Sequence, residues 1–508
     1  MNARILIVCS EAVPLVKTGG LADVITSLAL ALRRRGIAAT VMMPGYPAAL
    51  EQARNLEEVG MLRDLPGGPG RLLLGAMSEH GIPVLLLSTA GFDRRCGNPY
   101  VDEQGMEYAD NAQCFGALAH AAAAVCAGET ALAVPHVVHA NDWHAGLVPA
   151  LLRLKRITDI GTLFTIHNLA FQGNFPFECA PALGIPRRML APDGLEFWGR
   201  LSFLKAGIRF AQRISTVSHT YASEILTPRF GHGMDGLLSE RKSDLLAIRN
   251  GVDTDTWNPA ADSLIARTFS LSDMRGKNMC KRELQALFNL PPDPFAPLLT
   301  VGSRITHQKM ADVAQASLPQ VLQRYPRAQL VVLGRGDHAY EQGFVRIAQC
   351  FPGRVGVHIG YDEKRAHALH AGADMLLHGS RFEPFGLTPL YSMRYGTIPI
   401  ASRVGGIIDT IVDAQLSGMP PEDASGILFD GEDADSMTAA ISRAFALYEN
   451  PGEWHPLQRN AMSADFSWSL PTQQYIVAYC GIAPPAARKL FAAQLEAPEP
   501  DIPAYKTA

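Results

Sequence analysis

Short apolar runs, each followed by a polar loop and then by a segment with helical periodicity, recur along the chain. The first run, at 5–9, leads through a polar loop to a helical segment at 21–35 and a second apolar run at 38–43. Apolar runs of this length are typical of buried parallel strands, and apolar stripes at 3.6-residue spacing are typical of helices. The pattern therefore predicts an α/β fold built from doubly wound parallel sheets.

A second series of such runs begins at 298–302, after turn-forming residues at Asn250, Gly251 and Pro259. With 508 residues the chain is also too long for a single core. We therefore expect four parts: an N-terminal domain at 1–250, a nucleotide-type domain at 251–461, a C-terminal helix at 462–482 that packs back on the first domain, and a flexible, Pro- and Ala-rich tail at 483–508.

The strongest local signal in the second half is a loop at 381–386. It follows an apolar run at 373–377 and precedes a helix that we expect from Pro389 to Tyr395. Thr388 has the chemistry of an N-cap, and proline suits the first helical position. This order of elements places a helix N-terminus directly after the end of a buried strand.

Such a helix N-terminus can hold an anion. Backbone N–H groups of Gly386, Leu387 and Thr388 would point at it, and Glu383 would lie beside the group that the anion carries. The alternative at this point is a structural turn with a solvated glutamate. The segment alone does not separate the two interpretations.

Cations and glycines in two other loops suit a phosphate group. Gly19 and Gly20 precede the first helical segment, where they allow close approach to the backbone, and Lys17 adds a positive charge. Arg304 and Lys309 follow the apolar run at 298–302, so both could reach one diphosphate in an inter-domain cleft. For each pair the alternative is a solvated surface cation.

Two neighbouring strands of the first half end in loops that carry His and Asp. These loops lie at 139–144, with Asp142, and at 167–173, with His167. Strand ends line the ligand crevice of a doubly wound sheet, so two such loops favour a polar binding site. The spacing does not indicate a metal, because no second ligand follows three or four residues later on a helix.

Composition excludes several functions. The net charge is −4, the pI is about 6.4, and 47% of residues are apolar, so neither a nucleic acid nor an anionic membrane is expected as a partner. The opening apolar run is too short for a signal peptide, and no uncharged run reaches membrane length. Eight cysteines are scattered without CxxC pairs. We expect a reduced, cytoplasmic protein without metal or other cofactor.

Taken together, these loops resemble the bacterial glycogen synthase and plant starch synthase family. The matching segments keep one order from residue 1 to about 480 and include LVKTGGLADV (15–24), VVHANDWHAGL (137–147), TIHNLAFQG (165–173), IRNGVDTDTWNP (248–259), SRITHQK (303–309) and SRFEPFGLTPLYSMRYGTIP (380–399). The resemblance implies the GT-B fold, with two Rossmann-like domains facing each other across a cleft. It also implies retaining transfer of glucose from ADP-glucose to the non-reducing end of an α-1,4-glucan such as glycogen, with release of ADP.

The resemblance carries residue roles with it. It assigns the donor to cations, backbone N–H groups and two cleft side chains: Lys17, Gly19, Gly20, Asn250, Arg304, Lys309, Tyr361, Gly386, Leu387 and Thr388. Tyr361 would lie near the adenine. His167 would lie against the glucose ring, and Glu383 would hold its hydroxyls, so these two join Lys17, Arg304 and Lys309 as the catalytic set. Tyr100 and Asp142 would lie on the acceptor side or line the cleft.

The implied chemistry is electrostatic. Breaking the bond to ADP creates an oxocarbenium-like centre and an anionic leaving group, which Lys17, Arg304 and Lys309 would stabilise without a metal. No residue is an obvious nucleophile, so we favour attack by the acceptor hydroxyl on the face that the phosphate leaves, with that phosphate as base. A double displacement through a carboxylate is the alternative.

Three positions depart from the family pattern. Family members more usually read EPCGLTQLY where this chain has Phe385 and Pro389, and QKG where it has Met310, which could disfavour a positive φ. We expect activity with an altered rate or donor choice. The alternatives are a transferase that uses UDP-glucose, against which KTGGLADV argues, and a glucan- or nucleotide-binding homologue with weak activity. A phosphorylase would need a pyridoxal-binding lysine segment, which we do not find.

Overall fold

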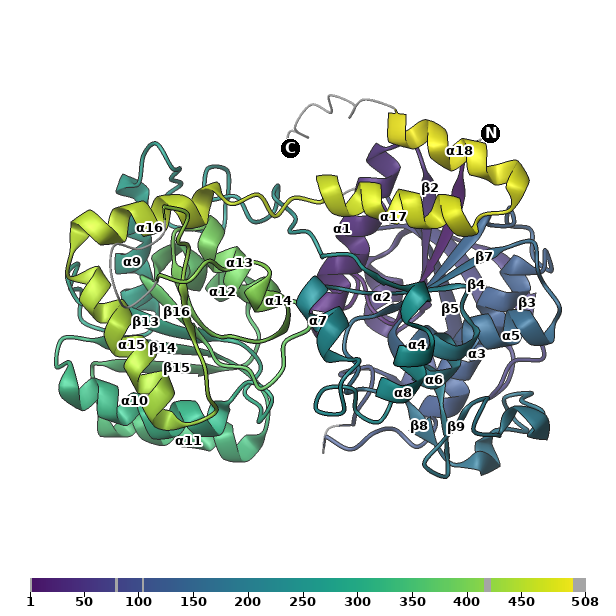
Figure 1. The fold of residues 1–508 in the computed structure, drawn as a ribbon, viewed down its shortest axis with the longest axis horizontal. Coiled ribbons are helices and arrows are strands. Elements are labelled where there is room, and N and C mark those ends of the chain that lie inside the picture. The colour runs from purple at the N-terminus through teal and green to yellow at the C-terminus, as the bar shows by residue number, and fades with distance from the viewer. Residues whose placement is uncertain (1, 78–80, 103–104, 415–421, 497–508) are drawn as a thin grey trace. The chain divides into compact units, whose positions relative to one another are not determined.

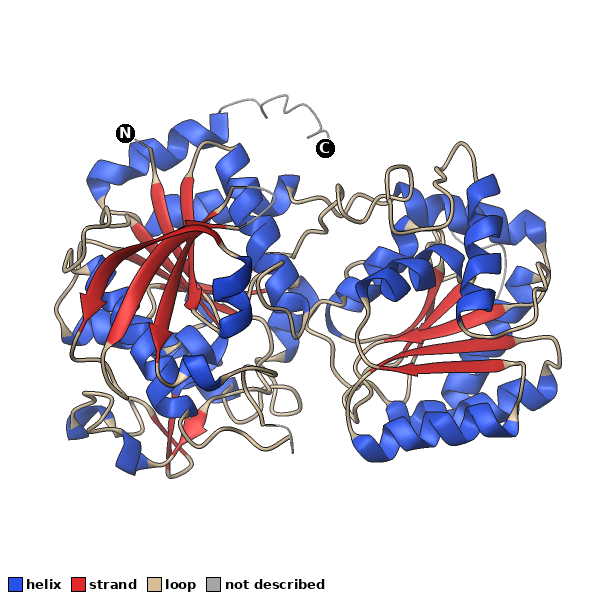
Figure 2. Ribbon diagram, turned by 180° about the vertical axis from the view of Figure 1, so that it is seen from behind, coloured by secondary structure: helices blue, strands red, loops and turns tan. Residues whose placement is uncertain are grey.

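The computed structural model describes residues 2–77, 81–102, 105–414 and 422–496. The chain divides into two compact units, which we call the first unit (Met1–Gly251 with Trp468–Ala508) and the second unit (Val252–Ser467). Each unit contains a mainly parallel sheet with helices on its faces (Figures 1 and 2). The predicted α/β fold class is thereby confirmed.

The sheet of the first unit has nine strands in the order β12-β11-β7-β6-β1-β2-β5-β4-β3. Strands β12 to β5 are parallel, and β4 and β3 extend the sheet in antiparallel fashion. The strands are β1 (Arg4–Val8), β2 (Ala38–Pro44), β3 (Arg54–Leu62), β4 (Gly70–Ala76), β5 (Pro83–Thr89), β6 (Val137–Asn141), β7 (Gly161–Ile166), β11 (Arg213–Thr216) and β12 (Leu245–Ala247). Their carboxyl ends place the polar loops after β1, β6 and β7 at one edge.

The first unit also holds a small antiparallel sheet that the sequence did not predict. It consists of β8 (Asn174–Phe175), β10 (Arg200–Ser202) and β9 (Glu196–Phe197), with β10 in the middle. Strand β8 continues the loop that follows β7. The small sheet is therefore connected directly to the polar edge of the main sheet.

Helices cover the sheet of the first unit. The longer ones pack through apolar faces; α3, for example, is rich in alanine and buried along most of its length. The helices are α1 (Gly20–Arg34), α2 (Pro47–Gln52), η1 (Phe92–Arg94), α3 (Asn111–Cys126), α4 (Asp142–Ala145), α5 (Leu147–Leu154), η2 (Phe177–Cys179), η3 (Arg187–Met189), α6 (Phe203–Phe210), α7 (His219–Glu224), α8 (Asp235–Glu240), η4 (Lys242–Asp244), α17 (Ser469–Ile482) and α18 (Pro485–Glu496).

The C-terminal helices α17 and α18 belong to the first unit and are yellow in Figure 1. Helix α17 contacts α1 and β7, and α18 packs along α17. The flexible tail expected from residue 483 is wrong for Pro485–Glu496, because the Phe491 side chain is fully buried there. Proline is favourable in a first helical turn and alanine throughout a helix, so this composition also suits a helix. Residues 497–508 of that prediction lie outside the described residues.

The sheet of the second unit has six parallel strands in the order β15-β14-β13-β16-β17-β18. The strands are β13 (Leu298–Gly302), β14 (Gln329–Gly334), β15 (Val355–Ile359), β16 (Met375–His378), β17 (Ile398–Ser402) and β18 (Ile427–Phe429). The strand order reverses between β13 and β16. In open parallel sheets, ligands bind outside the carboxyl ends at such a reversal.

Eight helices of the second unit are described. They are α9 (Arg275–Leu287), α10 (Ala311–Arg324), α11 (His338–Cys350), α12 (Glu363–Gly372), α13 (Leu387–Arg394), α14 (Gly405–Ile408), α15 (Ala434–Tyr448) and α16 (Pro451–Ser463). Helix α13 begins after the loop that follows β16. Across both units, no described helix is long and apolar enough to cross a membrane.

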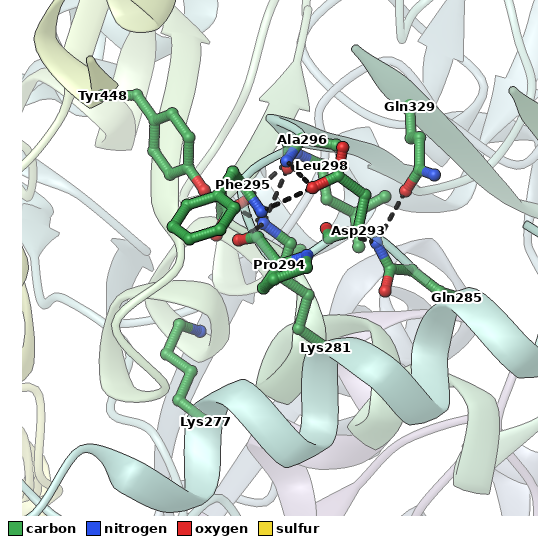
Figure 3. A network of polar contacts seen from close by, with 12 residues as sticks. Lys277, Lys281, Gln285, Asp293, Pro294, Phe295, Ala296, Leu298, Gln329 and Tyr448 are labelled. Carbon is green, nitrogen blue, oxygen red and sulfur yellow. Dashed lines mark hydrogen bonds and ion pairs between the residues drawn. The ribbon is translucent and has the colours of Figure 1, made fainter. Parts of the chain in front are cut away.

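A lysine of α9 anchors the N-terminal edge of this sheet (Figure 3). The Lys281 ammonium lies 2.6 Å from the Asp374 carboxylate and donates to the Ala296 carbonyl at 2.7 Å and to the Tyr448 hydroxyl at 3.0 Å. The same carboxylate accepts from the backbone N–H of Leu298 at 2.9 Å. A buried ion pair with further hydrogen bonds of this kind fixes α9, β13 and β16 together.

A second lysine of α9 reaches the C-terminal end of α13. Lys277 donates to the Tyr395 carbonyl at 2.7 Å, the Thr397 hydroxyl at 2.9 Å and the Ala371 carbonyl at 3.1 Å. Burial lowers the pKa of Lys277 to about 7. Helix α13 is thus tied to the body of the unit at the end opposite to the polar edge of the sheet.

We expect Phe491→Ala to destabilise the first unit by about 3 kcal/mol or more, because the change removes a fully buried ring that packs on Tyr479 and His136. Urea unfolding measures this loss. The control is Val477→Ala on the exposed surface of α17, which should stay within about 0.5 kcal/mol of the wild type. Equal unfolding of Phe491→Ala and the wild type would show that α18 does not contribute to the folded core.

Candidate functional site

The polar loops of the second unit gather where its strand order reverses. Arg304 and Lys309 follow β13, and Glu383 follows β16, which is the parallel neighbour of β13. The carboxyl ends of adjacent parallel strands lie at the same edge, so these loops meet. Lys309 and Glu383, predicted separately from the sequence, form a direct ion pair.

Glu383 is the centre of a buried polar cluster. Its Oε2 accepts from the Lys309 ammonium, from His378 Nε2 at 2.8 Å and from the Ser380 hydroxyl at 3.0 Å. Burial would raise the pKa of Glu383, but the Lys309 charge and the His378 hydrogen bond together hold it well below its usual range. Glu383 is therefore an ionised carboxylate inside the protein.

Sequence reasoning missed the two neutral partners of Glu383. His378 ends strand β16, and burial lowers its pKa, so the imidazole is neutral and donates through Nε2. Ser380 lies in the loop two residues later. Both residues lie just before Glu383 in the sequence. The signal that could have identified them is that polar residues directly follow a buried strand.

Helix α13 begins two residues earlier than predicted. Its first residue is Leu387, and its N-cap is Gly386 at φ +90°, a left-handed conformation that favours glycine. The expected N-cap at Thr388 and first position at Pro389 are therefore wrong. Pro389 occupies the third helical position, where its missing N–H has no intrahelical acceptor in any helix. The N–H groups of Leu387 and Thr388 remain at the helix start.

The departures Phe385 and Met310 are both accommodated inside the second unit. Phe385 is only 4% exposed, and a Cβ on Gly406 would lie 2.5 Å from Phe385 Cα, so the loop packs closely on helix α14. Met310 has φ +54° at the N-cap of α10 and is fully buried. The chain therefore adopts the positive φ at this position with a residue that has a Cβ, at a cost of about 1–2 kcal/mol.

Two further predicted residues lie on the surface near the same edge. Arg304 is exposed and donates to the Gln308 side chain at 3.1 Å. Tyr361 follows β15, is 62% exposed, and donates its hydroxyl to the Glu363 carboxylate. Both side chains are accessible to a ligand at the carboxyl edge of the sheet.

In the first unit, the structure brings together the predicted loops after β6 and β7. Asp142 follows β6 at φ +53°, and its Oδ1 accepts from the backbone N–H of His167 at 2.8 Å and of Asn168 at 3.3 Å. Burial raises the pKa of Asp142 to about 7. A left-handed aspartate at the end of a buried strand is a strained arrangement of the kind that occurs at functional sites.

His167 is oriented by its neighbour on β6. Its Nε2 lies 3.0 Å from the Asn141 Oδ1, which can only accept, so Nε2 carries the proton. Burial lowers the pKa of His167 to about 3. The imidazole is therefore neutral and presents Nδ1 as an acceptor.

The loop after β1 holds an acid that sequence reasoning missed. Glu11 is buried, and its Oε2 accepts from the Thr18 backbone N–H at 2.5 Å and from the Thr18 hydroxyl at 2.7 Å. Burial raises the pKa of Glu11 to about 7. The predicted Lys17 forms an ion pair with Asp23 at 3.0 Å. Nothing in the sequence around Glu11 indicated that this residue would organise the loop.

The remaining predicted residues of the first unit lie in or beside the same loops. Gly19 is the extended N-cap of α1, and Gly20 is its first residue. Tyr100 hydrogen-bonds the Ser10 hydroxyl at 2.7 Å, in the loop that also contains Glu11. Asn250 is buried at the end of the unit, and its Oδ1 has no hydrogen-bond partner among the described residues. Within the described ranges, no group of three His, Cys, Asp or Glu side chains could hold a metal ion.

Comparison with known proteins gives a consistent result over the whole chain. The starch synthase catalytic domain family matches residues 4–240, and glycosyl transferases group 1 matches residues 289–460. The glycogen synthase of Ralstonia nicotianae is 51% identical over 486 residues, 96% of this chain and 89% of that protein. The glycogen synthase of Bordetella petrii is 48% identical over 503 residues, 98% of this chain and 96% of that protein.

Solved structures agree with this result. The catalytic domain of starch synthase IV from Arabidopsis thaliana, bound to ADP and acarbose, matches with a TM-score of 0.84 and 27% identity, covering 98% of this chain and all of that one. Sucrose-phosphate synthase from Thermosynechococcus elongatus matches with a TM-score of 0.59 and 20% identity over 97% of this chain and all of that one. The second match concerns the fold alone.

The raised pKa of Glu11 predicts a pH-dependent stability. Glu11 has a pKa of about 7 in the folded protein, whereas a glutamate of the unfolded chain loses its proton above about pH 4. Raising the pH between these values therefore favours the unfolded chain. The contribution of Glu11 to the free energy of unfolding is full below about pH 4 and is lost as the pH rises through about 7. We expect Glu11→Gln to gain stability relative to the wild type as the pH is raised from 4 to 8. Melting temperatures of both proteins across this range test it. A constant difference between them would contradict the assignment.

Proposed function

This chain belongs to the family of glycogen and starch synthases, and on that premise we propose that it extends an α-1,4-glucan with glucose taken from ADP-glucose. The chain is a glycosyltransferase with the GT-B fold. The observation that carries the proposal is the ionised, buried Glu383 beside the start of α13, at the strand reversal of the second unit.

The second unit supplies what a sugar nucleotide requires. A diphosphate needs cations and N–H donors, which Arg304, Lys309 and the start of α13 provide. We assign the adenine to the exposed face of Tyr361, where an aromatic ring can stack on a base. The starch synthase IV structure, bound to ADP, supports a nucleoside diphosphate as the ligand.

Glu383 suits the glucosyl group. An ionised carboxylate accepts hydrogen bonds from sugar hydroxyls, and its negative charge stabilises the positive charge that develops on the anomeric carbon. His378 and Ser380 use only Oε2 of this carboxylate. Oε1 is then the oxygen that we assign to the donor sugar.

The first unit contributes to the sugar and the acceptor in this proposal. His167 is neutral, so its Nδ1 would accept from a glucose hydroxyl while Asn141 holds the ring. Lys17, with the Gly19 and Gly20 backbone, would add positive charge and N–H donors for the phosphates. We assign Tyr100, Asp142 and Asn250 to the walls around the transferred sugar and the acceptor.

The proposed reaction is a transfer with retention of configuration. Cleavage of the bond between the anomeric carbon and the phosphate oxygen is stabilised by Arg304 and Lys309 on the leaving diphosphate. The acceptor hydroxyl then attacks from the same face and gives its proton to that phosphate, so no enzyme nucleophile is needed. The acceptor is the non-reducing end of glycogen or a related glucan, in line with the names of the relatives.

Incubation of the protein with glycogen and either ADP-glucose or UDP-glucose tests this function. We expect ADP release and glucan growth in equal amounts with ADP-glucose, and turnover with UDP-glucose at least tenfold slower. A boiled sample and a sample without glycogen serve as controls.

Preference for UDP-glucose would contradict the donor assignment only. Binding of both donors without any turnover would favour a glucan- or nucleotide-binding homologue, which the departures Phe385 and Met310 had suggested as the alternative.

A further inference from the structure

The hairpin of the small sheet holds a tryptophan out into solvent. Strands β9 and β10 pair antiparallel, with Trp198 and Gly199 forming the two-residue turn between them. The Trp198 side chain is 80% exposed, the largest value among the exposed large hydrophobic residues of the described chain. Tryptophan side chains are highly buried on average in folded proteins. An indole that is this exposed contributes little hydrophobic stabilisation to the fold.

The turn is also an unfavourable position for tryptophan. Trp198 and Gly199 have φ values of +51° and +74°, as in a type I′ hairpin turn. Both central positions of that turn favour Asn, Asp or Gly, and a bulky residue with positive φ is an outlier. Exposure and backbone strain therefore both oppose tryptophan here, which indicates a role outside folding.

The ring is held in place from behind. The neighbouring Phe197 packs edge-to-face with the indole, at 6.2 Å between centroids and 74° between planes. A Cβ on Gly233 would lie 3.0 Å from Trp198 Nε1 and 3.1 Å from Phe197 Cζ, so the backbone at Gly233 approaches both rings closely. The indole therefore packs on Phe197 and the Gly233 backbone at one side and remains open to solvent elsewhere.

Polar side chains lie on the segments that lead to this surface. Gln172 donates to the His232 carbonyl at 3.0 Å, which links the loop after β7 to the segment behind the indole. Asn174 donates to the Gln172 side chain at 3.1 Å. In the same loop Phe171 is 49% exposed, and it follows His167 by four residues.

We propose that Trp198 is the stacking platform of an accessory binding site for an α-1,4-glucan chain on the first unit. The C–H face of a glucose ring is apolar and packs on an aromatic plane, whereas its hydroxyls need polar partners at the rim. The partly exposed Gln172 side chain and the exposed guanidinium of Arg200 are such partners. The choice of glucan rests on the proposed function, whose acceptor is a polymer with many glucose units beyond the reacting end.

The position of the platform fits a polymer. The loop after β7 carries His167, assigned to the transferred sugar, and runs directly into Phe171 and β8 of the small sheet. When this loop holds one end of a glucan, other branches or glucose units of the same molecule can reach Trp198. The platform would therefore raise the affinity for glycogen without touching the reacting atoms.

The test is Trp198→Asn, which places the preferred Asn-Gly pair in the turn. We expect its melting temperature to equal or exceed that of the wild type. Its retardation by glycogen in native gels should weaken, and its KM for glycogen should rise about five- to tenfold, the equivalent of one aromatic contact. The KM for a short acceptor such as maltotriose, and for the donor, should stay within about twofold.

Phe295→Ala is the matched control, because Phe295 is 73% exposed on the second unit and should leave glycogen binding unchanged. Wild-type retardation and KM of Trp198→Asn would overturn the proposal, and so would equal losses on glycogen and maltotriose. If the wild type elongates no glucan, the proposed function fails. The gel measurement still decides on the platform in that case.

Discussion

A buried carboxylate must be compensated, and this constraint organises the second unit around Glu383. The charge is stabilised by Lys309 from the loop after β13 and by His378 and Ser380 from β16 and the following loop. Removing Lys309 would leave the Glu383 charge without a counterion in a low-dielectric interior, and removing His378 or Ser380 would cost the carboxylate a hydrogen bond. The two loops are therefore fixed relative to each other before any ligand binds. This arrangement is what a site for a sugar nucleotide needs, since preorganised charge acts without reorganisation during the reaction.

The buried acids of the first unit have raised pKa values, in contrast to Glu383. Asp142 and Glu11 accept hydrogen bonds from backbone N–H groups and the Thr18 hydroxyl, and burial raises both pKa values to about 7. Glu383, which is paired with a lysine, is ionised throughout the physiological range. The two units therefore place one permanent and two titratable carboxyl groups at the carboxyl ends of their sheets.

The sequence predicted the candidate site residues that lie at strand ends. It did not predict features that depend on backbone conformation or on contacts between distant segments. Glu383, Lys309, Asp142 and His167 were predicted because each follows an apolar run. The sheet topology then brings Lys309 to Glu383 in the second unit and Asp142 to His167 in the first. The start of α13 was predicted two residues too late. Thr388 has the chemistry of an N-cap, but the N-cap is Gly386 in the left-handed conformation. Helix α18 was missed because its Pro- and Ala-rich composition is equally typical of a tail. Burial of Phe491 depends on contacts with Tyr479 of α17 and with His136 before β6, which composition does not reveal.

In the proposed function, the carboxyl edge of the second unit binds a nucleoside diphosphate. Calorimetric titration of ADP into the wild type and into Arg304→Ala measures this binding. Arg304 is exposed and makes a single side-chain hydrogen bond to Gln308 among the described contacts, so its removal should not disturb the fold. We expect the wild type to bind ADP and Arg304→Ala to bind it about tenfold or more weakly, because the change removes one charge-assisted contact to phosphate. Equal ADP affinities of the two proteins would contradict this expectation.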